Sequence, residues 1–286
     1  MKNAFTVDVE DYFQVEGFAG VIDRSSWDGF GTRVQANTNA LLELLASHGT
    51  SATFFVLGWV ARKHPEIVRE IAASGHEIAS HGMSHRLIYT QTPAEFRQET
   101  RDSKALLEDL CQKPVIGYRA ATYSITRKSL WALDILCEEG FRYDSSIFPM
   151  RHDRYGIHDA EPKPHILTTP GGNRLVEFPI SVLRYGKAKI PVAGGGYFRL
   201  FPYWLTRWGL RQLNLQNQEF VFYVHPWEID SAQPRIKDAG LLSRFRHYLN
   251  LDRCARRLGQ LLSDFEFDTM HNILAERALF DGGAKA

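Results

Sequence analysis

Short apolar runs alternate with longer amphipathic stretches through the first half of the chain. Continuous apolar runs such as 52–57 are typical of strands buried on both faces of a parallel sheet. Between them apolar residues recur at helical spacing, and a glycine or proline marks most helix ends. This alternation predicts β–α units and a parallel sheet of the α/β class, arranged as a barrel. The expected strands are 4–9, 52–57, 75–79, 115–119 and 141–144, and the expected helices are 32–48, 66–74, 92–111 and 126–139.

The regular alternation stops between residues 148 and 200. Proline, glycine and histidine are dense there, and 166–181 predicts a hairpin around a Pro-Gly-Gly-Asn turn. We interpret 148–200 as an irregular insertion over the barrel mouth, within one domain of residues 1–275, and 276–286 as a frayed tail. The remaining pattern predicts a helix at 202–215, a buried strand at 220–225, a basic amphipathic helix at 241–262 and a last strand at 265–270. We interpret the arginines of the basic helix as a solvated face: Arg244, Arg246, Arg253, Arg256 and Arg257.

The composition is that of an ordinary globular protein, since 44% of the 286 residues are hydrophobic and 23% are charged. The net charge of +1 gives no overall reason to expect a nucleic-acid partner or a membrane surface. No apolar run approaches the length of an integral membrane segment, and a strand begins almost at once. Cys111, Cys137 and Cys254 are dispersed over predicted helices, which indicates reduced thiols. We therefore expect a soluble cytoplasmic domain of enzyme size.

A pair of histidines, His81 and His85, follows the predicted strand at 75–79. Two imidazoles four residues apart can reach the same ion, and the glycine between them leaves room for a ligand. Two ligands are too few for a metal site, so a carboxylate from another strand end is expected. The first strand ends in three of them, Asp8, Glu10 and Asp11.

Other chemically competent residues also lie at predicted strand ends. In a barrel of parallel strands the carboxyl ends converge on one mouth, where catalytic groups collect. A metal held by two histidines and one carboxylate keeps open positions, which suits hydrolysis better than a structural role. The full set of candidates at this mouth is Asp8, Glu10, Asp11, His81, His85, Arg119, Asp144 and His225.

Four short motifs resemble those of the metal-dependent polysaccharide deacetylases, the NodB-homology or chitin-deacetylase-like carbohydrate esterases. They are residues 6–8 (Thr-Val-Asp), 81–85 (His-Gly-Met-Ser-His), 119–123 (Arg-Ala-Ala-Thr-Tyr) and 222–225 (Phe-Tyr-Val-His). The resemblance covers roughly residues 4–270 and implies the distorted (β/α) barrel of that family. Residues 8–13, 194–199 and 225–228 most resemble the branch associated with exosortase and exopolysaccharide loci.

The chain departs from the family pattern in two places. The family has adjacent aspartates followed by glycine, whereas here Val9, Glu10 and Asp11 follow Asp8. Residues two apart on a strand share a face, which favours Glu10 as the ligand, but a bulge could bring in Asp11 instead. Both assignments stay open at this stage. The second departure is Ala121, where the arginine motif usually has proline.

The resemblance implies hydrolysis of an N-acetyl amide on a sugar, with Zn²⁺ as the expected metal and Co²⁺ or Ni²⁺ as alternatives. Asp8 would act as general base, oriented by Arg119, and His225 as general acid toward the leaving amine. Asp144 resembles the residue that pairs with the catalytic histidine. The backbone N–H of Tyr123 would help to hold the oxyanion. Four more aromatic residues are expected to stack on sugar rings: Tyr197, Phe198, Trp227 and Trp27.

Two other functions compete with a deacetylase acting on a bacterial exopolysaccharide or oligosaccharide. One is a metal-dependent amidase for a small amide or ureide on the same scaffold, since fold does not settle function. The other is a carbohydrate-binding protein without catalysis, which the complete set of motif residues disfavours.

Overall fold

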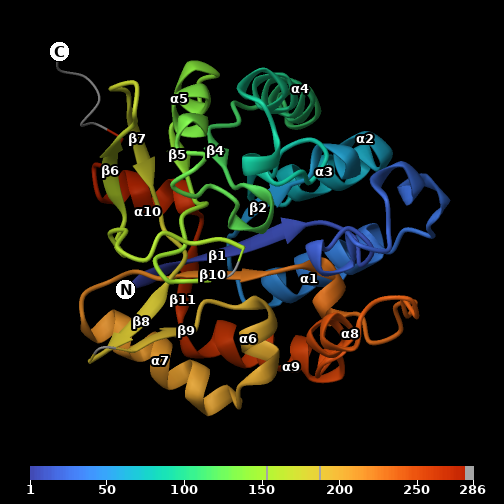
Figure 1. Cartoon of the computed structure of the whole chain (residues 1–286). Helices are drawn as coiled ribbons and strands as arrows, with labels where there is room; N and C mark the ends of the chain where they lie inside the picture. Colours follow the sequence, from blue (N-terminus) through green and yellow to red (C-terminus); the bar gives the residue numbers. More distant parts are fainter. Residues whose placement is uncertain (153, 187, 281–286) are drawn as a thin grey trace.

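The fold is built on one twisted, mostly parallel sheet, which the computed structural model describes together with its helices over residues 1–152, 154–186 and 188–280 (Figure 1). The strand order is β10-β1-β2-β3-β4-β5-β7-β6, and β11 pairs with β1 off this path. All neighbours are parallel except β6 and β7. The strands are β1 (Lys2–Val9), β2 (Thr53–Val56), β3 (Glu77–Ser80), β4 (Gly117–Tyr118), β5 (Tyr143–Asp144), β6 (His165–Thr168), β7 (Arg174–Glu177), β10 (Val221–Val224) and β11 (Glu266–Asp268).

Helices pack around this sheet in the β–α alternation that the sequence predicted. The α/β class with a (β/α) arrangement is thus confirmed, although among the described residues the end strands β10 and β6 do not pair to close a barrel. The helices are α1 (Val34–Ser47), α2 (Gly58–Lys63), α3 (Pro65–Ala73), α4 (Pro93–Cys111), α5 (Trp131–Glu138), α6 (Gly195–Leu200), α7 (Tyr203–Leu215), α8 (Leu241–Tyr248), α9 (Leu251–Asp264) and α10 (Met270–Glu276).

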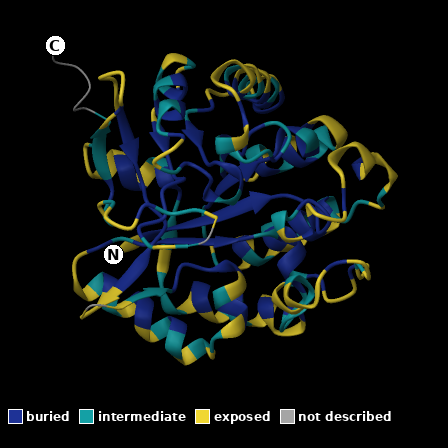
Figure 2. Cartoon of the chain, viewed as in Figure 1, coloured by how far each residue is buried: buried dark blue, intermediate teal, exposed yellow. Residues whose placement is uncertain are grey.

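The apolar runs of the sequence are the buried strands of the sheet. All four residues of β2 are buried, as are seven of the eight in β1, because helices or loops cover both faces (Figure 2). Local signals set the helix ends as well. At α4 the Thr92 side chain accepts a hydrogen bond from the Glu95 N–H and Glu95 accepts one from the Thr92 N–H, which makes a capping box.

The predicted helix over 241–262 is wrong in one respect, since it is two helices. Asn250 adopts a left-handed conformation with φ of 51° and separates α8 from α9, a conformation that asparagine tolerates better than most residues. Arg257 of α9 is not simply solvated, because its guanidinium donates to the carbonyls of Phe198, Arg199 and Phe201 at the end of α6.

Residues 148–200 are more than an insertion over the mouth. The predicted hairpin exists as β6 and β7, but β7 also pairs in parallel with β5 and so belongs to the main sheet. A second hairpin, β8 (Val182–Tyr185) with β9 (Ala188–Pro191), forms a separate small sheet. At the other end of the chain Phe280 packs against Tyr143 and Arg142, so 277–280 are not frayed. The rest of the expected tail, 281–286, lies outside the described residues.

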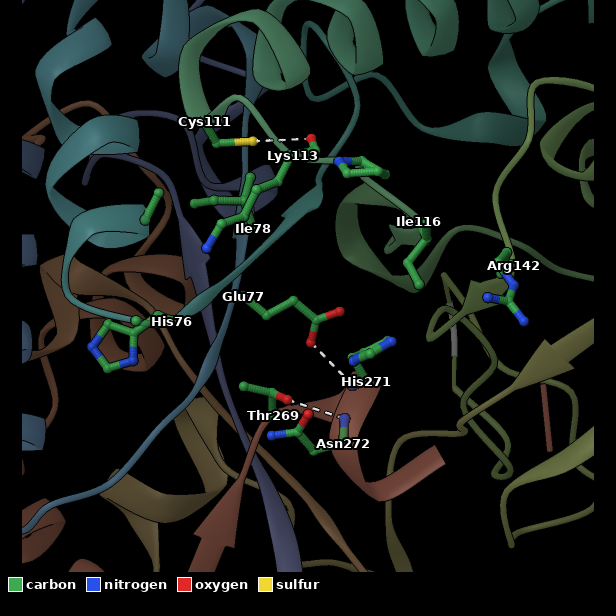
Figure 3. Close-up of a pocket in the computed structure, with 13 residues that line it drawn as sticks. His76, Glu77, Ile78, Cys111, Lys113, Ile116, Arg142, Thr269, His271 and Asn272 are labelled. Carbon is green, nitrogen blue, oxygen red and sulfur yellow. Dashed lines mark hydrogen bonds between the residues drawn. The ribbon is translucent and has the colours of Figure 1, made fainter. Parts of the chain in front are cut away.

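A cavity of about 510 Å³ lies at the amino ends of the strands, opposite the predicted mouth (Figure 3). Glu77 in its wall is half-buried, and its carboxylate is held by three hydrogen bonds. Its carboxylate accepts hydrogen bonds from Thr53 Oγ1 at 2.6 Å, Tyr143 Oη at 2.8 Å and the His271 N–H at 3.1 Å. These bonds join β2, β3, β5 and α10, so this carboxylate is part of the framework.

The three cysteines are free, as predicted, and two of them are buried. In the part of the chain that the structure describes, no helix has both the length and the apolar character needed to cross a bilayer.

Gly117 in β4 offers a test of how tightly this framework is packed. A Cβ there would lie 2.1 Å from Cζ of Tyr143, which is itself fixed by Glu77. We expect Gly117→Ala to lower the free energy of unfolding by about 1–3 kcal/mol, the usual cost of overpacking, measured by urea denaturation. Gly20→Ala, where no atom lies within 4 Å, is the control and should change it by less than about 0.5 kcal/mol. Equal stability of the two variants would contradict this packing.

Candidate active site

Glu10, His81 and His85 form a buried cluster at the carboxyl ends of β1 and β3. One potential ligand atom from each lies within 4.8 Å of the other two. Parallel pairing of β1, β2 and β3 brings these distant segments together, and the His81 N–H donates to the carbonyl of Val56 at the end of β2. Four residues later, His85 adopts a left-handed backbone conformation with φ of 55°. This turn brings the second imidazole back beside the first, with the ring centroids 5.5 Å apart.

His81 is held in the form that a metal ligand needs. Its Nδ1 lies 2.8 Å from the carbonyl oxygen of Arg119. A carbonyl can only accept, so Nδ1 carries the proton and Nε2 keeps its lone pair toward the cluster. Burial also lowers the pKa of His81 to about 4, despite the opposing influence of the Asp8 carboxylate. The ring is therefore neutral around pH 7.

Glu10 supplies the anionic member of the cluster. Burial by itself raises the pKa of Glu10, but His85 and His225 outweigh it and bring the pKa to about 2. Its Oε2 lies 2.8 Å from His85 Nε2, yet no donor among the described residues makes a well-formed hydrogen bond to that oxygen. A buried carboxylate oxygen without a proper donor, facing two imidazole nitrogens, fits a divalent cation.

Asp11 lies outside this cluster and binds backbone N–H groups instead. Its Oδ2 accepts hydrogen bonds from the N–H groups of Arg33 and Val34 at 2.7 and 3.0 Å, and its Oδ1 accepts one from Tyr12. The side chain therefore fixes the start of α1. Of the two carboxylates that the sequence left open as ligands, the geometry favours Glu10, because the oxygens of Asp11 are already occupied by backbone donors.

Asp8 and Arg119 form a fully buried ion pair beside the cluster. Arg119 Nη1 donates to Asp8 Oδ1 at 2.6 Å and to Thr6 Oγ1 at 2.8 Å. On its other side the guanidinium donates to the hydroxyl and the carbonyl of Ser145. Its flat face lies 4.0 Å from the centre of the Phe55 ring. These contacts fix the orientation of Asp8 and leave Oδ2, its second oxygen, 4.0 Å from His225 Nε2.

His225 follows β10 and faces both carboxylates of the first strand. Its Nε2 lies 3.6 Å from Glu10 Oε1, and its Nδ1 lies 2.7 Å from Glu228 Oε1. The ring stacks on Trp227 at 5.2 Å. Burial lowers the pKa of His225, but the carboxylates of Glu10, Glu228 and Asp8 together raise it to about 9. The imidazole is therefore protonated in this environment.

The partner of His225 is a residue that the sequence reasoning missed as functional. Glu228 binds the imidazole through Oε1 and Arg199 Nε through Oε2, at 2.7 and 2.6 Å. Arg199 is buried and also donates to the carbonyls of Arg246, His247 and Leu249, which fixes its position. A signal was present in the His-Pro-Trp-Glu sequence, because a glutamate three residues after a strand end can close a capping box.

Asp144 does not pair with His225, and that expectation is wrong. Its carboxylate accepts from the hydroxyl of Ser146 at 2.6 Å and contacts Glu177 on the neighbouring strand. Burial raises the pKa of Asp144 to about 6, and burial with the nearby Asp144 charge raises that of Glu177 well above its usual range. Two adjacent buried carboxyls cannot both ionise, so they share a proton at neutral pH.

The aromatic predictions divide into those at the cavity and those in the core. Tyr123 and Trp227 line the active-site cavity, which has a volume of about 180 Å³. Trp27 and Phe198 do not, because Trp27 packs between Phe13 and Trp59 of α2, and Phe198 packs against Phe222. Tyr197 is half-buried beside Phe201 and does not line the cavity either. Tyr155 and Tyr223 line it and were missed.

The backbone of Tyr123 also differs from expectation. Its N–H donates to the carbonyl of Ala120 at 3.0 Å and is therefore not free to bind an oxyanion. Thr122 and Tyr123 both adopt left-handed conformations, with φ of 54° and 53°. Two consecutive left-handed residues are strained, and here they turn the Tyr123 ring against Tyr223 in the cavity wall.

Two family models match the chain, and together they account for most of it. Residues 25–136 match the polysaccharide deacetylase family, and residues 145–275 match a domain of unknown function (DUF3473). Strands β2 to β4 of the sheet lie in the first match, and strands β6, β7, β10 and β11 lie in the second.

Known relatives agree with the first match. The chain is 32% identical over 99 residues to a chitooligosaccharide deacetylase from a Bradyrhizobium species, an overlap of 35% of this chain and 43% of the relative. The chain thus spans less than half the length of this curated relative. A solved Mycobacterium smegmatis structure assigned as a polysaccharide deacetylase shares the fold, with a TM-score of 0.63, 23% identity and coverage of 96% and 89% of the two chains. A solved Puue allantoinase also shares it, with a TM-score of 0.61, 16% identity and coverage of 96% and 89%.

Residues 25–136 therefore match the polysaccharide deacetylase family that the motifs resemble, and the solved structures share the fold. The nearer likeness to the exopolysaccharide-associated branch stays a prediction.

Separate substitution of Glu10 and Asp11 should distinguish the ligand from its neighbour. We expect Glu10→Gln to weaken Zn²⁺ binding at least about tenfold, because it removes the anionic donor. Asp11→Asn should bind Zn²⁺ like the wild type but lose about 1 kcal/mol of stability at the start of α1. Calorimetric titration with Zn²⁺ and urea unfolding measure the two effects, and the reverse order of Zn²⁺ affinities would make Asp11 the ligand.

The shared proton of Asp144 and Glu177 should make stability depend on pH. Both pKa values are raised by folding, so the pair's contribution is complete below the unfolded value near 4 and is lost as the pH rises through about 6 and beyond. We expect the free energy of unfolding of the wild type to fall as the pH rises from about 4 toward the folded pKa values, by up to about 1.4 kcal/mol per pH unit for each carboxyl group that is ionised in the unfolded chain and still protonated in the folded one. Glu177→Gln has no proton to lose and should flatten this dependence. Parallel pH curves from urea unfolding would contradict the shared proton.

Proposed function

We propose that this protein is a metal-dependent deacetylase that removes N-acetyl groups from amino sugars of a polysaccharide or oligosaccharide. One observation carries the proposal. The Glu10–His81–His85 cluster lies between two polar groups of opposite charge. One is the Asp8 carboxylate, which Arg119 holds, and the other is the His225 imidazole, which Glu228 holds. An oriented carboxylate on one side and a protonated imidazole on the other suit hydrolysis of an amide.

Glu10, His81 and His85 would hold the metal, and two imidazoles with one carboxylate suit Zn²⁺, with Co²⁺ or Ni²⁺ as alternatives. When bound, the ion supplies Lewis acidity, which polarises a carbonyl group and makes water more acidic. The buried cluster would bind it with a single anionic side chain, which would leave positive charge at the site for a developing oxyanion.

Asp8 is the proposed general base. Its Oδ1 is occupied by Arg119, so Oδ2 is the oxygen that can accept a proton from water as the water attacks the acetyl carbonyl. Thr6 and Ser145 hold the guanidinium from both sides and prevent Asp8 from rotating away. Arg119 is thus a positioning residue, since it acts through the Asp8 carboxylate.

His225 is the proposed general acid. Cleavage of the C–N bond leaves an amine, a poor leaving group unless it is protonated. With Nδ1 bound to Glu228, the His225 ring directs Nε2 toward the cluster, and Nε2–H is the proton available to the departing nitrogen. Glu228, fixed by Arg199, keeps the imidazole in this orientation and stabilises its charge.

The substrate class is inferred from chemistry and from relatives. The cavity wall offers Tyr155 and Tyr223, which suit the faces of sugar rings, and the matched Bradyrhizobium protein is a chitooligosaccharide deacetylase. The resemblance of residues 8–13, 194–199 and 225–228 to the exopolysaccharide-associated branch makes a bacterial exopolysaccharide the proposed substrate. We infer that the two matched segments act as one unit, because both supply groups to this cavity.

Acetate release tests the proposal. The metal-loaded protein should release acetate from an N-acetylated chitooligosaccharide, and metal removal or His81→Ala should abolish the activity. Release only from small amides would favour the amidase alternative. Sugar binding without any release, in protein shown to hold Zn²⁺, would favour a non-catalytic role and contradict the proposal.

The acid role of His225 makes a sharper prediction. We expect His225→Ala to lower kcat on the N-acetyl sugar by roughly 10²–10⁴, with a much smaller loss on an acetate ester whose leaving group needs no proton. Glu228→Gln should show the same preference with a loss of about tenfold or more, because it only loosens the imidazole. Asp8→Asn is the matched control and should impair both substrates. Equal losses on the two substrates in folded His225→Ala protein would rule out the acid role.

A further inference from the structure

Helix α8 presents an unpartnered apolar strip to solvent. Leu241, Leu242 and Phe245 are 82%, 61% and 56% exposed, although helices of globular proteins usually bury such residues. At about 100° per residue, these three side chains lie within roughly one third of the helix circumference. The opposite side of α8 carries Ser243 and His247, which face the protein.

Cations flank this strip on both sides. The helical positions of Arg244 and Arg246 lie on either edge of the strip, and the preceding loop adds the exposed Arg235 and Lys237. Among the described residues, none of these four cations has a carboxylate within ion-pair distance, and Asp238 is the only acid in 234–248. The segment therefore carries a net charge of +3 in a chain whose total is +1.

The apolar strip and its cations also border a shallow groove of about 330 Å³, lined by Arg235, Leu241, Arg244 and Phe245 among others. Exposed apolar residues on α7 provide a contrast within the same molecule. Trp204 and Leu215 are 68% and 78% exposed, but the nearby cations Arg207 and Arg211 both face Asp264. The combination of bare apolar side chains with unpaired cations thus distinguishes α8 from α7.

We propose that α8 docks the protein on an anionic membrane surface, with Leu241, Leu242 and Phe245 entering the interface and the flanking cations binding lipid headgroups. This is the arrangement of a helix that lies in the plane of a bilayer. A polyanionic sugar would satisfy the cations but not the leucines, which offer no flat face for stacking. A second copy of the chain, meeting the first through the same face, would bring +3 against +3.

Helix α8, which carries the docking face, contacts residues that line the active-site cavity. His247, on the inner side of α8, stacks on Trp227 at 4.1 Å, and Trp227 lines that cavity. The α8 helix also packs on η1 (Glu16–Phe18), where Phe18 contacts His247 and Glu16 lines the same cavity. Docking would therefore hold the cavity near the membrane surface. The proposal does not depend on which reaction the cavity performs.

Vesicle sedimentation of the full chain tests the proposed membrane docking of α8. The wild type should bind phosphatidylcholine vesicles that contain phosphatidylglycerol and should bind pure phosphatidylcholine vesicles far less. Its affinity for the anionic vesicles should fall as the ionic strength rises. Arg244→Gln with Arg246→Gln should weaken binding by about 30-fold, since each basic residue near an anionic leaflet contributes roughly a factor of five. Leu241→Ser with Leu242→Ser and Phe245→Ser should weaken it at least about tenfold.

The matched control is Trp204→Ser with Leu215→Ser on α7, which removes comparable exposed apolar area and should bind vesicles like the wild type. Thermal unfolding of every variant checks that the fold is intact. The proposal is overturned if the wild type fails to bind anionic vesicles, if lipid charge makes no difference, or if the α8 variants bind like the control. Light scattering that shows a dimer dissolved by Phe245→Ser would assign the face to a second copy instead.

Discussion

The site depends first on the buried side chain of Arg119. Its guanidinium fixes Asp8 from one side and Ser145 from the other, while its backbone carbonyl fixes the tautomer of His81. One residue therefore determines both the orientation of the proposed base and the lone pair of a proposed metal ligand. A buried cation left without its carboxylate is expensive, so Asp8 and Arg119 stabilise the fold only as a pair. The same constraint keeps β1, β4 and β5 in register at their carboxyl ends.

The second half of the chain supplies a separate set of polar residues on the other side of the site: His225, Glu228 and Arg199. Glu228 lies between His225 and Arg199. The burial of Glu228 and Arg199 is tolerated because each charge has an opposite neighbour and further hydrogen bonds. Beside the Glu10–His81–His85 cluster, His225 lies 3.6 Å from Glu10 and 4.0 Å from Asp8. The proposed acid and base thus come from different halves of the sequence, which the parallel pairing of β1 with β10 brings together.

Burial gives similar residue types different roles in this protein. Asp8, Glu10, Asp144 and Glu228 are all buried carboxyl groups near the carboxyl ends of strands, yet three face cations or imidazoles and one faces another carboxyl. The first three suit charged chemistry. Asp144 with Glu177 instead holds a proton and fixes the loop at Ser146, whose hydroxyl accepts the Ala120 N–H next to Arg119.

The sequence alone determined the βα rhythm, the buried strands, the helix cap at Thr92 and the convergence of Asp8, His81, Arg119 and His225, because strand periodicity and chain order govern these features. Tertiary structure decided what depends on neighbours distant in sequence. In the folded structure Asp11 binds backbone N–H groups at the start of α1, and Asp144 pairs with Glu177. Glu228 pairs with His225, and Trp27 and Phe198 are buried. A carboxylate or an aromatic ring has the same local preferences in each of these roles. Only the donors, charges and packed side chains that the fold brings beside it select among them.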